Sequence, residues 1–197
     1  MSVSVIKKVA IDEADKFVLT HKQWGTDAYN VPVYAQIAYD DTGFIVKFTV
    51  EEADPRRTKT QHLEHVHKDC CVEFFVNFTP EATNKYINFE VNANGVMNAG
   101  FRSGRKDAVP LEIHEMDAMH ITPCIEADHW TVTYQIGYDF IKKYFPTFDI
   151  DRCDYVLGNL YKCGDETEME HYVAYFPLRL KRPNFHNPRF FRKIAVK

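Results

Sequence analysis

The stretch KDCCVEFFVNF, residues 68–78, alternates between two kinds of side chain. Every second residue from position 70 is apolar, and the positions between carry charged, amide and aromatic groups as well as a thiol. Successive side chains of a β-strand point to opposite faces of a sheet, so this pattern predicts a strand over Cys70–Phe78 with one apolar inner face. That face consists of Cys70, Val72, Phe74, Val76 and Phe78.

Residues 86–92 and 155–161 show the same alternation, so three strands each present an outer face of carboxylates, amides and aromatic rings. In a sandwich such a face is either ordinary solvated sheet surface or a sugar-binding surface. Sugar hydroxyls need planar, bidentate hydrogen-bonding partners, and the apolar faces of a pyranose ring pack on aromatic rings. The outward residues considered for sugar binding are Glu73, Asn88, Glu90, Asn159 and Tyr161.

Many other short strand patterns follow at close spacing, separated by turns such as Asp40-Asp41-Thr42-Gly43 and Asn92-Ala93-Asn94-Gly95. The only helical pattern is Tyr138–Tyr144, which is stopped by Pro146. This organisation predicts an all-β, antiparallel β-sandwich with one short helix. The further strands are expected at Val33–Ile37, Gly43–Val50, Lys85–Asn92, Gly95–Phe101, Met119–Ile125, Trp130–Ile136, Tyr155–Lys162 and His171–Phe176.

Length and composition favour one globular domain spanning residues 1–197. Hydrophobic residues make up 45% of the chain and charged residues 26%, which excludes a disordered protein. No apolar stretch is long enough to cross a bilayer. The net charge of −4 argues against a nucleic-acid-binding surface, although the chain after Glu170 is basic and rich in phenylalanine. An anionic ligand such as an acidic sugar stays open for this basic part of the chain. Oligomeric state is not predicted.

The five cysteines have an odd count and irregular spacing, which is not typical of a disulfide framework. Cys70, Cys124 and Cys153 are expected to be small buried hydrophobes. Cys163 precedes Gly164, a pair expected to form a turn in which the glycine adopts a special backbone angle. The N-terminus shows no signal-peptide pattern, so the expected location is cytoplasmic, or extracytoplasmic if a leader has been removed.

Three parts of the chain resemble carbohydrate-binding module family 9, the xylan- and cellulose-binding modules often attached to xylanases. They are VPVYAQIAYDDTGFIVKFTVEE, then HVHKDCCVEFFVNF with YINFEVNANG, and finally GNLYKCGDET with HYVAYFPL and NFHNPRFF. Their order and separation fit from about Tyr29 to Phe191. The resemblance implies an immunoglobulin-like sandwich that binds an oligosaccharide or polysaccharide, commonly at a chain end, between two aromatic rings.

The resemblance also implies roles for particular residues. Glu73 matches the glutamate of the family's Asp-x-x-Val-Glu strand and is expected to hydrogen-bond a sugar hydroxyl. One clamp tryptophan of the family precedes that strand, where this chain has His65 and His67, and the other falls at Tyr175-Phe176. A histidine–tyrosine clamp implies weaker sugar binding or a different ligand. The predicted sugar-binding set is Glu73, Asn88, Glu90, Asn159, Tyr161, Lys162, Tyr175 and His67, with Lys162 and Tyr175 expected on or beside the same surface.

Metal binding has two weaker signals. His62, His65 and His67 form H-x-x-H-x-H, in which two imidazoles and a carboxylate would suffice to hold zinc, although histidines in a long connection are more often simply exposed. No cofactor is predicted from the residues themselves, whereas the resemblance implies that calcium binding is open. The candidate oxygen ligands for calcium, none at EF-hand spacing, are Asp40, Asp41, Asp149, Asp151 and Asp154.

Three functions are therefore weighed. The favoured one is non-catalytic carbohydrate binding. The alternative is a divergent glycan-active enzyme, with a metal at His62, His65 and His67, and the third is a haem-binding or redox relative. Glu73 and Glu90 are expected to face each other on adjacent strands, but an open sheet face would leave them in water with ordinary acidity. They are therefore interpreted as binders rather than catalysts.

Overall fold

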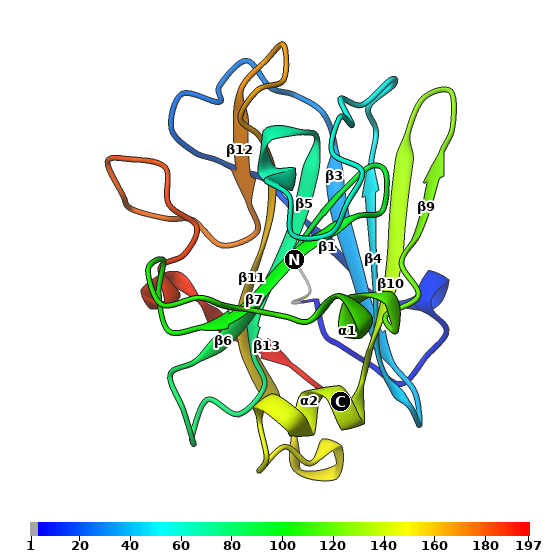
Figure 1. The fold of residues 1–197 in the computed structure, drawn as a ribbon, viewed down its shortest axis with the longest axis vertical. Coiled ribbons are helices and arrows are strands. Elements are labelled where there is room, and N and C mark those ends of the chain that lie inside the picture. Colours follow the sequence, from blue (N-terminus) through cyan, green and yellow to red (C-terminus); the bar gives the residue numbers. More distant parts are fainter. Residues whose placement is uncertain (1–3) are drawn as a thin grey trace.

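The computed structural model describes residues 4–197 and shows two antiparallel sheets packed face to face (Figure 1). Residues 1–3 of the predicted single domain lie outside the described residues. The five-stranded sheet has the order β1 (Lys16–Val18), β3 (Val33–Tyr39), β4 (Gly43–Val50), β10 (Trp130–Gly137) and β9 (Thr122–Ile125). The predicted hairpin of β3 and β4 is confirmed, with the Asp40 side chain accepting the N–H groups of Thr42 and Gly43 at the turn.

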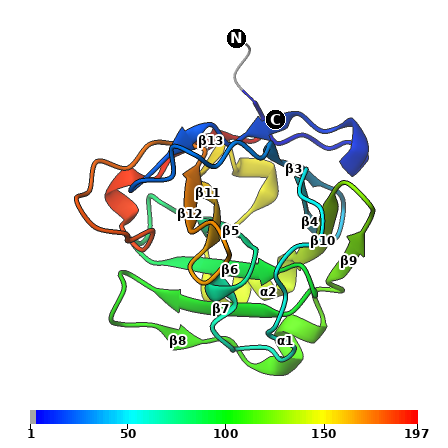
Figure 2. The same cartoon turned by 90° about the horizontal axis from the view of Figure 1, so that it is seen from above.

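The eight-stranded sheet holds the segment with the strict alternation near its centre. Its order is β2 (His21–Lys22), β12 (His171–Ala174), β11 (Tyr155–Gly164), β5 (Cys71–Asn77), β6 (Tyr86–Asn92), β7 (Met97–Arg102) and β8 (Val109–Pro110), and β13 (Arg192–Ala195) pairs with β11. Figure 2, seen from above, shows the two sheets as separate layers. The predicted β-sandwich is confirmed.

Helix is scarce, but the prediction of a single short helix is wrong. The expected helix α2 (Tyr138–Tyr144) is present, and α1 (Ile113–Asp117) was not anticipated. Its five residues are too few for a periodic pattern, and a capping box between Glu112 and Glu115 supports it instead. The remaining helical turns are η1 (Ile11–Glu13), η2 (Val66–Lys68), η3 (Ile150–Arg152) and η4 (Pro188–Phe190). Among the described residues, no helix has the length and apolar character needed to span a membrane.

The hydrophobic core lies between the sheets and follows the predicted inner faces. Val72, Phe74 and Val76 of β5 are at most 1% exposed and meet Phe48 and Val132 of the opposite sheet in one cluster. Burial of this apolar area supplies about 25 cal/mol per Å² and is the main force that holds the layers together. The turn between β6 and β7 ends at Gly95, whose φ of 76° lies in the left-handed region that favours glycine.

The outer face of the eight-stranded sheet, which points away from the other sheet, is not solvated surface. Every residue of β5 and β6 is buried on both faces. A second apolar cluster covers this outer face and includes Phe75, Tyr161, Phe185 and Phe191. Residues 178–191, here named the covering segment, supply part of it and lie on the far side of this sheet from the other sheet (Figure 1).

The thiols differ from their predicted environments in three places, one of which is Cys153, expected to be buried and only partly so. All five cysteines are free, and Cys70 is buried as expected. Cys124 is exposed because it lies on β9, at the edge of the five-stranded sheet, so its predicted burial is wrong. The predicted turn at Cys163-Gly164 is also wrong, because β11 continues to Gly164, which pairs with His171 of β12.

Candidate functional site

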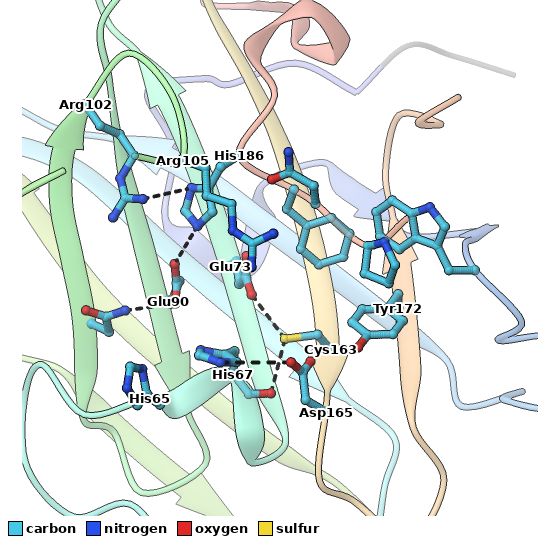
Figure 3. Close-up of a pocket in the computed structure, with 15 residues that line it drawn as sticks. His65, His67, Glu73, Glu90, Arg102, Arg105, Cys163, Asp165, Tyr172 and His186 are labelled. Atoms are coloured by element: carbon cyan, nitrogen blue, oxygen red, sulfur yellow. Dashed lines mark hydrogen bonds and ion pairs between the residues drawn. The ribbon is translucent and has the colours of Figure 1, made fainter. Parts of the chain in front are cut away.

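A pocket of about 340 Å³ opens on the outer face of the eight-stranded sheet, within the size range of small-ligand sites (Figure 3). Strands β5, β6, β7, β11 and β12 contribute to it, together with η2, the loop around Trp24 and the covering segment. Rigid strands thus form the floor, while loops form the walls. The pocket joins segments that lie far apart in the sequence.

Two glutamates form the floor of the pocket. Glu73 of β5 and Glu90 of β6 are directly opposite in the sheet register, and each is 3% exposed. Glu90 accepts hydrogen bonds from the side-chain amides of Asn88 and Asn98, both at 3.1 Å, and lies 3.5 Å from His186 Nε2. Glu73 accepts the thiol hydrogen of Cys163 at 3.1 Å. The predicted outer-face pair is therefore real and lies at the bottom of a cavity.

The two carboxyls carry different charge. Burial, with the neighbouring Cys163 and Glu90 adding to it, raises the pKa of Glu73 well above its usual value. Burial also favours the neutral form of Glu90, but the hydrogen bonds from His186 and Asn98 outweigh it and hold the pKa of Glu90 below its usual value. The floor thus offers one neutral carboxyl, which both donates and accepts, beside one carboxylate, which accepts only.

This difference corrects the reason for which catalysis was disfavoured. A solvent-exposed face was expected to leave both glutamates with ordinary pKa values. Burial and hydrogen bonding instead shift the two pKa values in opposite directions. Geometry still argues for binding. Glycosidases hold a scissile bond between two carboxyls placed about 5–9 Å apart across it. Glu73 and Glu90 project side by side from neighbouring strands of the pocket floor. Both carboxyls therefore meet a ligand from the same side.

An aromatic wall stands beside the floor. The ring centroid of Trp24 lies 5.5 Å from that of Tyr172 and 5.4 Å from that of Phe185. The indole N–H of Trp24 donates to the Leu180 carbonyl at 2.8 Å, which fixes the ring. Phe185 is stacked on Tyr161, with centroids 4.0 Å apart and planes at 12°. Rings held in this way offer rigid apolar area at little entropic cost.

Sequence reasoning missed this aromatic wall. It did not identify Tyr172, Phe185, His186 or Trp24 as site residues. Only the Trp24 loop gave a signal for a site residue. Its tryptophan stands among polar residues in HKQWGTD, where no alternating pattern predicts a strand that would bury it in the core. The covering segment gave no such signal, since its phenylalanines fit a packing role equally well.

The three histidines of H-x-x-H-x-H do not converge on one point. His65 and His67 both line the pocket, with ring centroids 5.4 Å apart, and His67 Nε2 lies 3.9 Å from an oxygen of Asp165 (Figure 3). His62 is turned elsewhere: its Nδ1 accepts the Met97 N–H at 2.9 Å and its Nε2 lies 3.4 Å from Asp117. A turn at His62 and Leu63 separates His62 from the pair, and His67 lies on η2.

Two other candidate ligand groups were compared with what metals require. Cys71, Glu73 and Cys163 place their ligand atoms within 4.8 Å of one another. Burial raises the pKa of Cys71 to about 12, and a hydrogen bond to Cys71 together with burial raises the pKa of Cys163. Both thiols keep their protons at neutral pH in the metal-free protein, so a metal would have to displace those protons to bind. Glu73 and Cys163 of this cluster line the pocket, and Cys71 is buried next to them.

Three of the five aspartates weighed for calcium are engaged with protein groups through their side chains. Asp40 binds the N–H groups of its own turn, Asp41 pairs with Lys8, and Asp149 accepts the Asp151 N–H. Asp40, Asp41, Asp151 and Asp154 line one pocket, but among the described residues no three of them bring their carboxylate oxygens within 4.8 Å of one another. Calcium binding stays a prediction of the family resemblance.

Three of the predicted sugar-binding residues line the pocket, namely Glu73, Glu90 and His67. Asn88 lies one layer below, as a donor to Glu90. Tyr161 supports Phe185 from underneath. Asn159 holds the backbone of Phe176 through both its amide nitrogen and its oxygen, each at 2.9 Å.

The predicted placement of Lys162 and Tyr175 on the outer surface is wrong. Lys162 lies on the inner face of β11, opposite Val72, fully buried, with its ammonium group on the Cys163 carbonyl at 3.0 Å and on His171. Tyr175 follows β12 on the core side, where its ring meets Phe17 at 5.4 Å. The long apolar stem of Lys162 packs in the core, while the carbonyl, the imidazole and the Glu52 carboxylate at 3.9 Å surround its charge.

A two-layer antiparallel sandwich with buried carboxyls and an aromatic wall on one outer face is the arrangement of a non-catalytic carbohydrate-binding module. The chain belongs to carbohydrate-binding family 9, whose model matches residues 5–196. This match confirms the resemblance seen in the sequence and extends it over nearly the whole chain. No curated protein matches the chain.

Solved structures share the fold. A proposed carbohydrate-binding protein from Bacteroides uniformis is 22% identical, with a TM-score of 0.81 over 99% of this chain and 98% of that one. A family 9 carbohydrate-binding module from Caldicellulosiruptor kristjanssonii, in complex with cellotriose, is 10% identical, with a TM-score of 0.67 over 100% and 94%. The same kind of module in complex with glucose gives 12% identity and a TM-score of 0.66 over 100% and 92%.

Proposed function

We propose that this protein binds the terminal sugar of an oligosaccharide or polysaccharide in the pocket on the outer face of the eight-stranded sheet. Glu73 and Glu90 hydrogen-bond the sugar hydroxyls from the floor. Trp24 and Tyr172 present rigid aromatic surface at the side, and His67 adds a polar contact at the mouth. The sugar is held and released without chemical change.

The floor carries the proposal. A neutral Glu73 beside a charged Glu90 supplies both donors and acceptors, which matches hydroxyl groups, since each hydroxyl donates once and accepts twice. Burial of both carboxyls strengthens these bonds by lowering the local dielectric constant. The volume of about 340 Å³ is at the small end of ligand pockets, which favours one ring at a chain end over a long internal segment. The modules that share this fold were solved with glucose and cellotriose.

The test is a glycan-array screen of the whole chain, followed by titration calorimetry with the best ligand. His67→Ala removes a pocket side chain that is 33% exposed, so folding is preserved. His129→Ala is the matched control, because His129 is 37% exposed, lies beside Asp128 and is outside the pocket. We expect His67→Ala to weaken binding about tenfold, the loss typical of one hydrogen bond at a site, and the control to match the wild type.

Glu90→Gln is a second pocket variant that keeps the shape of the side chain while removing its charge. It is expected to weaken binding by at least as much as His67→Ala, because charged acceptors form the stronger hydrogen bonds. A folded protein that binds no glycan on the array would contradict the proposal. So would a ligand whose affinity is the same in the wild type, His67→Ala and Glu90→Gln, since that sugar would be bound elsewhere.

A further inference from the structure

Arg102, at the end of β7, is an arginine buried without a counter-ion. It is 9% exposed and lines the pocket. Within residues 4–197, Arg56 and Arg152 form ion pairs with carboxylates closer than 4.0 Å, whereas Arg102 and Arg105 form none. The Nε of Arg102 is buried and has no hydrogen-bond partner in the described chain. Burying a charge costs several kcal/mol unless it is paired, so a partner from outside the chain is expected.

The one polar side-chain contact that Arg102 makes within the described residues is with His186, and it leaves most of the guanidinium free. Arg102 Nη1 lies 3.4 Å from His186 Nδ1, and His186 Nε2 lies 3.5 Å from Glu90 (Figure 3). Arginine only donates, so Nδ1 is the acceptor, which Arg102 shares with the Tyr86 hydroxyl at 3.2 Å, and the proton of a neutral imidazole stands on Nε2, facing Glu90. This relay orients His186 and occupies one N–H of Arg102. Glu90 itself is kept away from the guanidinium by the imidazole ring between them.

Gly100 lies beside the guanidinium and precedes Arg102 by two residues on the same face of β7. A Cβ at position 100 would lie 3.4 Å from Arg102 Nη2 and 3.6 Å from Asn88 Oδ1. That amide oxygen of Asn88 is buried and lacks a hydrogen-bond partner among residues 4–197. A glycine in the middle of a strand is locally unfavourable. Here the nearest neighbour of an added Cβ would be the Val109 carbonyl oxygen at 3.2 Å.

A second guanidinium faces the same space. Arg105 lies in the exposed loop after β7 and lines the pocket. Arg102, His186 and Arg105 lie together at one side of the pocket, and His67 and Asp165 lie at the opposite side (Figure 3). Positive charge is therefore gathered at one side of the pocket.

We infer that the sugar bound in this pocket is a uronic acid, whose carboxylate is held by Arg102 and Arg105 while its hydroxyls meet the floor. This inference rests on the proposed function and names the class of sugar. A planar guanidinium fork binds a carboxylate in bidentate fashion, and a uronic acid is the sugar that carries this group. Glucose and cellotriose, the ligands in the structural relatives, have no such group to offer these arginines.

The experiment compares matched pairs of sugars by titration calorimetry on the whole chain. Cellobiouronic acid is compared with cellobiose, and digalacturonic acid with galactobiose, while a cellobiose that carries a sulfate ester at the same carbon tests for other anions. At least one uronic acid is expected to bind about tenfold or more tightly than its neutral partner, since hydrogen bonds to charged groups contribute the most. Added salt should reduce this preference.

Arg102→Met and Arg105→Met are the test variants, and Arg152→Met, which lies outside the pocket, is the control. The preference for the uronic acid should fall toward one in both test variants and persist in the control. Arg102→Met should also unfold no more easily than the wild type, because it removes an unpaired buried charge. Marked destabilisation of Arg102→Met would mean that Arg102 has a partner within the protein and would overturn the premise that its charge is unpaired. Arg105 is exposed, so Arg105→Met should fold and still allow the binding test.

The failures of the two proposals are distinguishable. Neutral sugars that bind in a His67-dependent manner as tightly as the uronic acids would overturn this inference and leave the proposed function standing. A sulfated sugar that binds more tightly than its carboxylated counterpart would also overturn it. Uronic acid preference that survives in both arginine variants would place the carboxylate elsewhere. Absence of binding to every sugar would overturn both proposals.

Discussion

The outer faces of the two sheets share an alternating sequence pattern but differ in their exposure to solvent. On the five-stranded sheet, outward residues of β10 such as Thr133 and Gln135 are partly or fully exposed. On the eight-stranded sheet, the outward residues of β5 and β6 are all buried. The difference comes from the covering segment and the Trp24 loop, which pack over one sheet and not the other. A binding pocket forms where that cover is incomplete.

The largest effect should come from removing an aromatic ring beneath the cover. Phe75→Ala deletes a fully buried ring whose centroid lies 4.7 Å from that of His186 and 5.1 Å from that of Tyr161. We expect a loss of about 3–5 kcal/mol in the free energy of unfolding, measured by chemical denaturation, because the cavity cannot collapse fully. Thr133→Ala, on the outer face of the other sheet, is the control and should stay within about 0.5 kcal/mol. If both variants lost less than about 0.5 kcal/mol in the free energy of unfolding, the outer faces of the two sheets would not differ in burial as described.

The next effect concerns Asn159, which was predicted to bind sugar and which the structure places outside the pocket. Its side chain ties the Phe176 backbone to β11 and accepts the Leu160 N–H at 2.9 Å. Asn159→Ala should lower the free energy of unfolding by about 2 kcal/mol, because buried backbone groups lose their partners. Gln135→Ala is the exposed control. Sugar affinity, measured where both variants are folded, should match the wild type, and a selective loss in Asn159→Ala would restore the binding role.

Period-2 alternation predicted which side each residue faces, and most of the fold follows from that. In residues 68–78 and 86–92 the inner and outer sets are as expected, and Glu73 and Glu90 are paired. Alternation alone also places Lys162 inside, with Val156 and Leu160. The predicted place of Lys162 on or beside the sugar-binding surface went against this pattern, and the structure agrees with the pattern.

The candidate site was harder to predict than the fold, because alternation does not say what packs on a face. Trp24 precedes β5 by more than forty residues, and Phe185 follows it by more than a hundred. Their meeting over Glu73 depends on the whole chain path. Burial of the two glutamates, and with it their unequal acidity, follows from the same distant contacts. Local sequence patterns therefore predict the floor of the pocket and cannot predict its walls.

Burial of Glu73 should also show in the pH dependence of stability. Its pKa in the folded protein is raised above the ordinary value of 4.5, so the folded state holds the proton more tightly than the unfolded state. The contribution of this group is complete below about pH 4.5 and is lost as pH rises toward the raised pKa. Glu73→Gln removes this dependence, so its stability relative to the wild type should rise with pH by up to about 1.4 kcal/mol per unit.

The measurement is chemical denaturation of both proteins between pH 4 and pH 8. Glu168→Gln, which removes an exposed glutamate, is the control and should stay within about 0.5 kcal/mol of the wild type. A constant difference between Glu73→Gln and the wild type over this interval would mean that Glu73 is as acidic in the fold as in water. The outer face would then be solvated at this point, as the alternating pattern alone allows.

The smallest effect is expected for removing the hydroxyl of Tyr161 while keeping its ring. Tyr161 was predicted to contact sugar, but its ring is buried under Phe185 and its hydroxyl reaches the Phe185 carbonyl at 3.5 Å, the outer limit of a hydrogen bond. Tyr161→Phe keeps the stack and should cost less than about 1 kcal/mol in unfolding experiments, with sugar affinity unchanged. Tyr161→Ala, its matched partner, should weaken binding, because Phe185 then loses the surface that holds it in the wall. If Tyr161→Phe weakened binding as much as His67→Ala, the hydroxyl would have to reach the sugar, and the cover over this strand would have to open when the ligand binds.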